Sequence, residues 1–274
     1  MNEDTLTRKL GRRWPLIGDD CAVVKARAVD LLFTTDLSIE DVHFTRESPA
    51  QEVGHRAVAR SLSDIAAMGG TPLYCLISFA LAPWTDQAWI DGFYRGVEKI
   101  LRKTKTELAG GDISHAREFV CDVAIWGSVD KGRALLRSGA RPGDAIYVSG
   151  PLGGWRHKHA IEPRLEAGRK LIGKATACMD ISDGLALDLH RLAMASGVQA
   201  HIDSVPLLKG ATLEQALHDG EDYELLYTAP PRKRVAGIRI GAIATGKPGH
   251  VAYQGKAVPQ LGYDHFRQHR SGSD

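Results

Sequence analysis

Runs of apolar residues alternate with polar stretches along the chain, and their spacing predicts strands and helices in turn. In the first half, strands are expected at 22–24, 31–35, 73–81, 119–129 and 134–137. A helix is expected at 51–68, because apolar positions recur there at spacings of four and three and two glycines follow it. The same periodicity predicts a second helix at 89–101.

The second half begins at a turn, Arg141–Asp144, which contains both Pro and Gly. After it we expect a strand at 145–148, a strand at 175–180 and a helix at 185–195. Gly197 closes this helix. We therefore predict two domains, 1–140 and 141–274, with an α/β or α+β fold.

Composition and charge exclude several classes of protein. The 274 residues carry 35 Lys and Arg against 33 Asp and Glu, with the two signs interspersed, so nucleic acid is not an expected partner. No apolar run approaches the roughly 20 residues that cross a membrane, and the chain begins without signal-peptide features. The four cysteines form no C-x-x-C pair, which is typical of a reduced chain. A cytoplasmic protein without membrane contact is expected.

Aspartates occupy positions where a charged side chain is costly. Those that end an apolar strand or lie within an apolar helix are Asp20, Asp36, Asp64, Asp112, Asp180 and Asp183. A buried carboxylate needs a partner, and few cationic residues lie beside these in sequence. Carboxylates that converge from several strand ends suit Mg²⁺ bound to phosphate oxygens. Taken singly, Asp19, Asp112 and Asp183 are better explained as turn residues or helix caps, so the prediction depends on the set.

The segment Asp180–Leu185 gives the sharpest local signal. It passes from strand to helix, Ser182 or Asp183 is placed to cap that helix, and Gly184 lets a ligand approach the backbone. Free N–H groups at a helix start bind phosphate oxygens. This segment therefore predicts a phosphate site beside a metal site.

A second phosphate motif is incomplete. Gly241–Lys247 matches half of a phosphate-binding loop, but Pro248 stands where Ser or Thr is required. A strand followed by a turn is expected there instead. Nucleotide binding would then depend on carboxylates, metal and backbone rather than on a loop lysine.

Three other polar residues stay ambiguous from the residues alone. Glu221 opens the segment Gly220–Thr228, and an ordinary polar turn explains it about as well as a functional role. His43 is better explained as a loop residue than as a substrate contact. Arg137 is a candidate phosphate clamp, although a single Arg at a strand end is commonly solvated.

Taken together, several segments resemble the thiamine-monophosphate kinase family, within the superfamily of aminoimidazole ribonucleotide synthetase. They are 17–20, 34–36, 42–44, 57–72, 109–112, 137–144, 180–185, 220–225 and 262–266. Each segment is weak alone, but the ordered set covers nearly the whole chain and is specific. The resemblance implies two α/β domains, with the N-terminal domain binding ATP and Mg²⁺ and pairing across a homodimer. It also implies transfer of the γ-phosphoryl group of ATP to thiamine monophosphate.

The resemblance also implies roles for individual residues, position by position. It implies several Mg²⁺ ions held by Asp20, Thr34, Thr35, Asp36, Asp64, Asp112, Asp180 and Asp183. Within this set the residues expected to be catalytic are Asp36, Asp64, Asp112, Asp180 and Asp183. Contacts to ATP are implied for Gly111, Asp112, Arg137 and Ser182, and contacts to thiamine monophosphate for His43 and Glu221.

The chain departs from the family pattern in two ways. The stretches 154–174 and 227–246 are shorter than is usual in the family. Where the family places an aromatic residue against the thiamine rings, this chain has Pro259–Leu261. We therefore expect Gln260 and Tyr263 to complete the substrate pocket, with Tyr263 supplying the stacking surface.

The expected mechanism is direct in-line transfer without a covalent enzyme intermediate. The attacking phosphate is already ionised, so repulsion between two anions is the problem, and metal ions held by carboxylates reduce it. Two alternatives stay open: a related ATP-dependent enzyme of the superfamily that acts on another acceptor, and a nucleotide-binding protein without catalytic activity.

Overall fold

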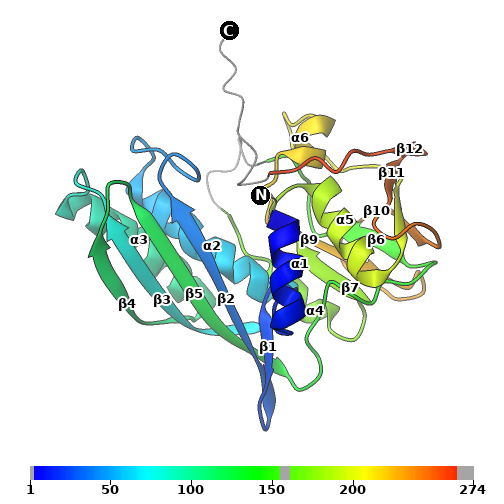
Figure 1. Cartoon of the computed structure of the whole chain (residues 1–274), viewed down its shortest axis with the longest axis horizontal. Helices are drawn as coiled ribbons and strands as arrows, with labels where there is room; N and C mark the ends of the chain where they lie inside the picture. Colours follow the sequence, from blue (N-terminus) through cyan, green and yellow to red (C-terminus); the bar gives the residue numbers. More distant parts are fainter. Residues whose placement is uncertain (1–2, 155–160, 264–274) are drawn as a thin grey trace.

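The computed structural model describes residues 3–154 and 161–263, which form two β-sheets with helices packed on them (Figure 1). The first sheet has the strand order β1-β2-β5-β3-β4. Its strands are β1 (Ala22–Lys25), β2 (Val29–Ile39), β3 (Thr71–Leu81), β4 (Glu107–His115) and β5 (Val120–Asp130). Neighbouring strands are antiparallel, except that β3 and β4 run parallel.

Two long helices, α2 (Ala50–Ala67) and α3 (Gln87–Thr104), cover one face of this sheet (Figure 1). Alternate residues of the strands, such as Ile77 of β3 and Val123 of β5, point to this face and are buried in the core. The residues between them point to the opposite face. There Leu37 of β2 is 50% exposed, so this second face is open to solvent.

The second sheet has the strand order β12-β11-β8-β10-β6-β9-β7. Its strands are β6 (Ala145–Val148), β7 (Ala177–Asp180), β8 (Gln199–Ile202), β9 (Leu225–Ala229), β10 (Ile238–Ala244), β11 (Val251–Tyr253) and β12 (Lys256–Ala257). The remaining helices are α1 (Glu3–Arg13), α4 (Leu165–Leu171), α5 (Leu185–Ser196) and α6 (Leu213–His218). Helix α5 packs on this sheet through β7, β8 and β11. Figure 1 shows α1 crossing between the two sheets.

Helix α2 joins the two halves of the molecule. It contacts β2 and β5 of the first sheet, and it also contacts β7 and α4 of the second half. The approach to α4 is close: a Cβ atom on Gly168 would lie 1.9 Å from the carbonyl oxygen of Ala66, so only glycine fits. The C-terminal end of α2 is thereby held at the junction, and this is where the candidate site forms.

Most elements predicted from the sequence are confirmed, and two predictions are wrong. The segment 134–137 is not a strand. It lies in space between the end of α2 and β7 and forms only isolated backbone hydrogen bonds, such as the one from Leu135 N–H to Met68 O at 3.1 Å. Asp112 does not end a strand but lies within β4, whose register shifts beside Gly110, a residue with φ of 147°. This shift breaks the alternation that sequence patterns rely on.

The mixed α+β class with two sheets is confirmed. The sheets lie on either side of residue 140, but the division into domains 1–140 and 141–274 stays a prediction. Within the described residues, no helix has the length and apolar character needed to span a membrane.

Candidate active site

Three carboxylates from distant parts of the sequence converge at the junction. Asp20 lies just before β1, Asp64 lies in the last turns of α2, and Asp180 ends β7. One carboxylate oxygen from each lies within 4.8 Å of the others. The sequence predicted that these aspartates share a site, and the fold brings the three together.

Hydroxyl groups orient this cluster. Ser63 Oγ donates a hydrogen bond of 2.6 Å to Asp180 Oδ2, and Thr34 Oγ1 donates to Asp64 Oδ2. Asp36 lies two residues after Thr34 on the same side of β2. Oδ2 of Asp36 and Oδ2 of Asp20 are buried, and within the described part of the chain neither has a hydrogen-bond partner.

The buried, mutually repelling carboxylates of this cluster favour a bound cation. Burial raises the pKa of Asp64 and Asp180 well above the usual value, and repulsion from the neighbouring carboxylates adds to it. Burial also raises the pKa of Asp20 and of Asp36, although Arg137 and Arg60 respectively offset part of the effect. Buried oxygen atoms without donors are the ligands that a hard divalent cation takes. The donor set therefore fits Mg²⁺.

Arg137 lies at one side of the cluster. Its Nη2 is 2.6 Å from Asp20 Oδ1, and its backbone N–H donates to the carboxylate of Asp19 at 3.1 Å. Burial and the charge of Asp20 raise the pKa of Asp19 to about 6, in spite of Arg137. The sequence left Arg137 as either a clamp or a solvated residue, and the structure places it against the cluster, with 20% of its side chain exposed.

The turn that leads into α5 is built differently from the predicted helix cap. The N-cap is Gly184, with φ of 112°, and no side chain caps the helix, so the prediction that Ser182 or Asp183 does so is wrong. Instead the carboxylate of Asp188, one turn into α5, accepts the N–H groups of Ser182 and Asp183 at 3.0 Å each. Arg191, one turn further on, contacts both Asp183 and Asp188.

The segment that follows Gly220 ties several parts of the chain together. Glu221 pairs with Arg56 of α2 at 2.7 Å, and Asp222 accepts the N–H groups of Gly153 and Gly154. Glu221 has φ of 53° although it is not glycine. Such left-handed conformations are costly and are typical of functional sites. Lys105, the C-cap of α3, has a similar φ of 58°, so the backbone leaves both explanations of Glu221 open.

His43 and Glu221 line one small pocket beside the cluster. The lining residues are Ser38, His43, Phe44, Val53, Arg56, Arg60 and Glu221. Arg60 also lies near Asp36, so the pocket adjoins the carboxylates. Tyr263 lies close by in the fold, since its N–H donates to the carbonyl oxygen of Asp183 at 3.1 Å. Gln260 is exposed on the same C-terminal segment, whereas residues 264–266 of the last matched motif lie outside the described residues.

Three predicted site residues are not brought to the cluster. Thr35 points to the open face of the first sheet, opposite to Thr34, because side chains alternate along a strand, and its Oγ1 donates to Asp122. Gly111 and Asp112 lie on the exposed edge strand β4. Asp112 is in register with Ser78 of β3, which in turn is in register with Asp122, so it also belongs to the open face.

Sequence reasoning missed Ser63, Asp188 and Arg191. Ser63 lies one residue before Asp64 and is completely buried, so a polar residue inside the apolar stretch of α2 was a usable signal. Asp188 is also completely buried, in the first turn of α5. Arg191 gave no signal, because a single Arg in a helix is ordinarily solvated.

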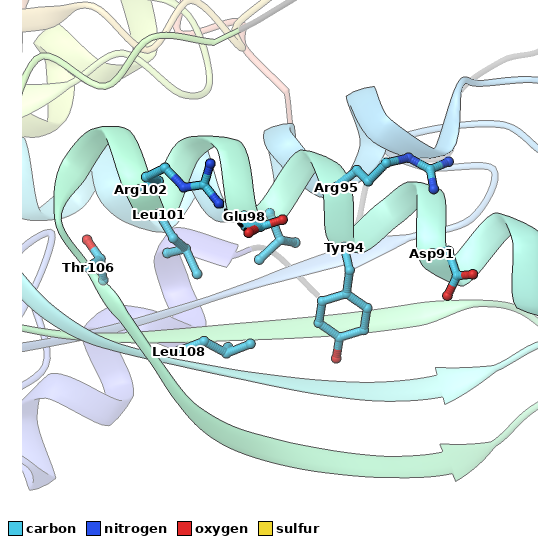
Figure 2. Close-up of a pocket in the computed structure, with 9 residues that line it drawn as sticks. Asp91, Tyr94, Arg95, Glu98, Leu101, Arg102, Thr106 and Leu108 are labelled. Atoms are coloured by element: carbon cyan, nitrogen blue, oxygen red, sulfur yellow. Dashed lines mark hydrogen bonds and ion pairs between the residues drawn. The ribbon is translucent and has the colours of Figure 1, made fainter.

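A groove of about 620 Å³ lies elsewhere, between α3 and β4 (Figure 2). Figure 2 shows Tyr94 reaching from α3 toward the strands, with Leu108 of β4 beside the same hollow. The other lining residues are Asp91, Arg95, Val97, Glu98, Leu101, Arg102 and Thr106. No residue predicted for the site lines this groove, and it holds none of the clustered carboxylates.

Comparison with known proteins decides the family. Residues 18–129 match the AIR synthase related protein, N-terminal domain. The thiamine-monophosphate kinase of Aquifex aeolicus is 34% identical to this chain, over 92% of this chain and 93% of its own length. The chain belongs to the thiamine-monophosphate kinase family. The thiamine-monophosphate kinase of Bacillus subtilis is 36% identical, over 77% of this chain and 76% of its own.

A solved structure supports the same assignment. The structure of AaThiL complexed with AMPPCP and TMP matches with a TM-score of 0.90 and 32% identity, and the match covers 97% of each chain. The resemblance stated from the sequence is thereby confirmed, as is the expectation of an enzyme. Members of the thiamine-monophosphate kinase family are kinases, and the carboxylate cluster lies in the part of the fold that this chain shares with them.

Proposed function

We propose that this protein transfers the γ-phosphoryl group of ATP to the phosphate of thiamine monophosphate, giving thiamine diphosphate and ADP. The observation that carries the proposal is the convergence of Asp20, Asp64 and Asp180 from three separate segments at one junction. The names of the relatives and the complex of AaThiL with AMPPCP and TMP support both substrates. The cytoplasmic location stays a prediction.

Mg²⁺ would be held by the clustered oxygen atoms. The residues that fit it are Asp20, Thr34, Asp36, Asp64, Asp180 and Asp183. When bound, the ions neutralise the phosphate charges and stabilise the charge of the transferring group. Buried oxygen atoms without partners on Asp20 and Asp36 support this role. Asp183 has its own partner, Arg191, in the metal-free chain.

The remaining chemistry requires little from the protein beyond positioning. The acceptor phosphate attacks the γ-phosphorus directly, with ADP as the leaving group, and no residue becomes covalently modified. Because that phosphate is ionised, no general base is required. Arg137 supplies a fixed cation for ATP at the edge of the cluster, and Ser182 contacts ATP from the turn before α5.

The acceptor would lie against the Glu221 side of the small pocket beside α2, whose volume of about 10 Å³ is too small to enclose the whole molecule. A thiazolium ring is cationic, so the Glu221 carboxylate is a suitable partner for it, with His43 in the same pocket. Tyr263 supplies a ring for stacking, and Gln260 an exposed amide. The ion pair with Arg56 holds the Glu221 carboxylate at this place.

A homodimer would explain why Thr35, Gly111 and Asp112 lie away from the carboxylate cluster in the single chain. The open face of the first sheet carries Phe33 and Trp126 in edge-to-face contact, with Leu37 and Tyr74 exposed by 50% and 48%. Apolar residues exposed together on a sheet face favour a second copy as a cover. Gly111, Asp112 and Thr35 would then lie at the interface. We propose that Asp112 acts there on the nucleotide of the partner's site.

The direct test is an assay for thiamine diphosphate formed from thiamine monophosphate, ATP and Mg²⁺. Asp64→Asn and Asp180→Asn should each reduce kcat by about 10³-fold or more, because each removes a charge that stabilises the transition state. Asp91→Asn is the matched control, since Asp91 is exposed on α3 away from the cluster and should leave kcat unchanged. Product formation that persists in Asp64→Asn at saturating Mg²⁺ would contradict the proposal.

Binding measurements separate the two alternatives from the proposed reaction. A thermal shift with Mg-ATP alone, followed by the addition of thiamine monophosphate, reports each ligand independently. Stabilisation by both ligands supports the proposal. Stabilisation by the nucleotide alone would favour another acceptor or a binding protein without activity.

A further inference from the structure

Arg191 is a buried cation that bridges three carboxylates at the side of the cluster. Its Nη1 contacts Asp183 Oδ2 and lies 3.0 Å from Asp188 Oδ1, and its Nε lies 3.0 Å from Asp4 Oδ1 of α1. Only 16% of its side chain is exposed. The three contacts occupy both edges of the guanidinium group, so its position is fixed.

The three partners differ in what else holds them. Asp188 is completely buried and also accepts the N–H groups of Ser182 and Asp183, so it stays in place whatever Arg191 does. The side chain of Asp183 is 16% exposed, and Arg191 is its charged partner. Asp183 is also one of the carboxylates that fit a divalent cation in the proposed function, on which this inference rests.

We propose that Arg191 is a placeholder cation for Asp183. In the structure the guanidinium pairs with the Asp183 carboxylate beside the site. When a divalent cation binds, the carboxylate passes from Arg191 to the ion, and Arg191 keeps its contacts to Asp188 and Asp4. Arg191 is therefore a positioning residue, and it competes with the metal for one carboxylate.

Electrostatics give the sign of the effect. Arg191 contacts Asp183 directly, so its charge lies beside the carboxylates that would hold the ion. Removing a positive charge beside clustered carboxylates makes the site more attractive to a divalent ion. Removing Arg191 also leaves the Asp183 carboxylate available to the ion without an ion pair to break. Loss of Arg191 should therefore strengthen metal binding in the absence of nucleotide, whereas loss of a purely structural contact should weaken it or leave it unchanged.

The experiment measures Mn²⁺ binding to the full chain without nucleotide, by electron paramagnetic resonance of the free ion. We expect Arg191→Gln to bind Mn²⁺ about tenfold more tightly than the wild type, from the charge removed at close range. Arg191→Lys keeps the charge and should lie between the two. Arg102→Gln is the matched control, since Arg102 is an exposed residue of α3 that pairs with Glu98 away from the cluster and its loss should leave Mn²⁺ binding as in the wild type.

Equal or weaker binding of Mn²⁺ by folded Arg191→Gln overturns the proposal. A crystal structure of the wild type with Mn²⁺ tests the proposal without any variant. In it Asp183 should contact the ion, and Arg191 should contact Asp188, either alone or together with Asp4. Persistence of the Arg191–Asp183 pair beside a bound ion overturns it as well. If the wild type binds no Mn²⁺, or if Asp180→Asn binds it as tightly as the wild type does, the proposed metal site itself is overturned. That failure is distinct from failure of the role of Arg191.

Discussion

Ser63 and Asp180 are joined across the junction between the two sheets by a hydrogen bond of 2.6 Å from Ser63 Oγ to Asp180 Oδ2. Ser63 lies in the last turns of α2, and Asp180 ends a strand of the second sheet. Both side chains are buried. The bond therefore fixes the relative position of two carboxylates, Asp64 and Asp180, that we propose as ligands of one ion.

Ser63→Ala should weaken metal binding and reduce stability together. Loss of a buried hydrogen bond to a charged group costs about 1–3 kcal/mol of the free energy of unfolding. The hydroxyl also lowers the pKa of Asp180, so its loss raises that pKa further and disfavours the ionised form that binds metal. Denaturant unfolding and the Mg²⁺ concentration for half-maximal rate measure the two effects.

The control for this change is Thr104→Ala, which also removes internal hydrogen bonds of a hydroxyl, the shortest to a backbone carbonyl being that from Thr104 Oγ1 to Ile100 O at 2.9 Å in α3. We expect it to leave the Mg²⁺ requirement unchanged. An unchanged Mg²⁺ requirement in Ser63→Ala as well would show that the bond is structural only.

Stability without metal should fall as pH rises. Burial, followed by the repulsion from Asp183, raises the pKa of Asp188 to about 7, and burial raises that of Asp19 to about 6. The folded state then binds these protons more tightly than the unfolded state. The resulting contribution to the free energy of unfolding is complete below the pKa of the unfolded chain and is lost as pH rises through the pKa values of the folded protein. In EDTA, the unfolding temperature should decrease from about pH 5 to about pH 8.

At the proposed site Mg²⁺ should oppose this loss, because the pKa values of its proposed ligands Asp64 and Asp180 are also raised and the ion would displace their protons. The rise in unfolding temperature caused by Mg²⁺ should accordingly be small at about pH 5.5 and large at about pH 8. Calorimetry with and without the ion measures the difference. A rise of equal size at both pH values would mean that the ion binds elsewhere.

Sequence patterns recovered the elements and the carboxylates for physical reasons that apply generally. The long helix around Asp64 and the strand that ends at Asp180 are strongly periodic or apolar, so a charge there stands out. The pattern could not assign faces across irregular backbone. Asp112 lies beyond the register shift at Gly110, and only strand pairing shows which way it points. Arg191 is significant only because Asp4 and Asp183 meet it in space.

Glu221→Gln should discriminate between the two substrates. The change removes the carboxylate proposed for the cationic thiazolium ring, so KM for thiamine monophosphate should rise by about tenfold or more while KM for ATP stays close to the wild type. Steady-state kinetics with each substrate varied in turn measures both constants. Glu214→Gln, on exposed α6, serves as the matched control.

This kinetic split also distinguishes binding from folding. Glu221 pairs with Arg56, so the variant leaves a partly buried cation without its partner and should be less stable. A loss of folded protein would lower the apparent kcat and leave both KM values unchanged, so a rise in KM reports the site itself. Equal increases in both constants would remove Glu221 from the acceptor pocket.

Asp112 gives a test of the homodimer that depends on catalysis in trans. Asp112→Asn and Asp180→Asn should each be nearly inactive as pure proteins. If Asp112 of one copy serves the site of the other, a mixed dimer contains one site with both changes and one site with neither. Random pairing of equal amounts then restores about a quarter of the wild-type activity.

The two variants need to be unfolded and refolded together, or produced together, so that mixed dimers form. Activity of the mixture is compared with the sum of the two pure proteins, and sedimentation confirms that dimers are present. If Asp112 served the site of its own chain, every site in a mixed dimer would carry one change and no activity would return. The position of Asp112 on the open face, in register with Ser78 and Asp122 and away from the cluster, favours restored activity.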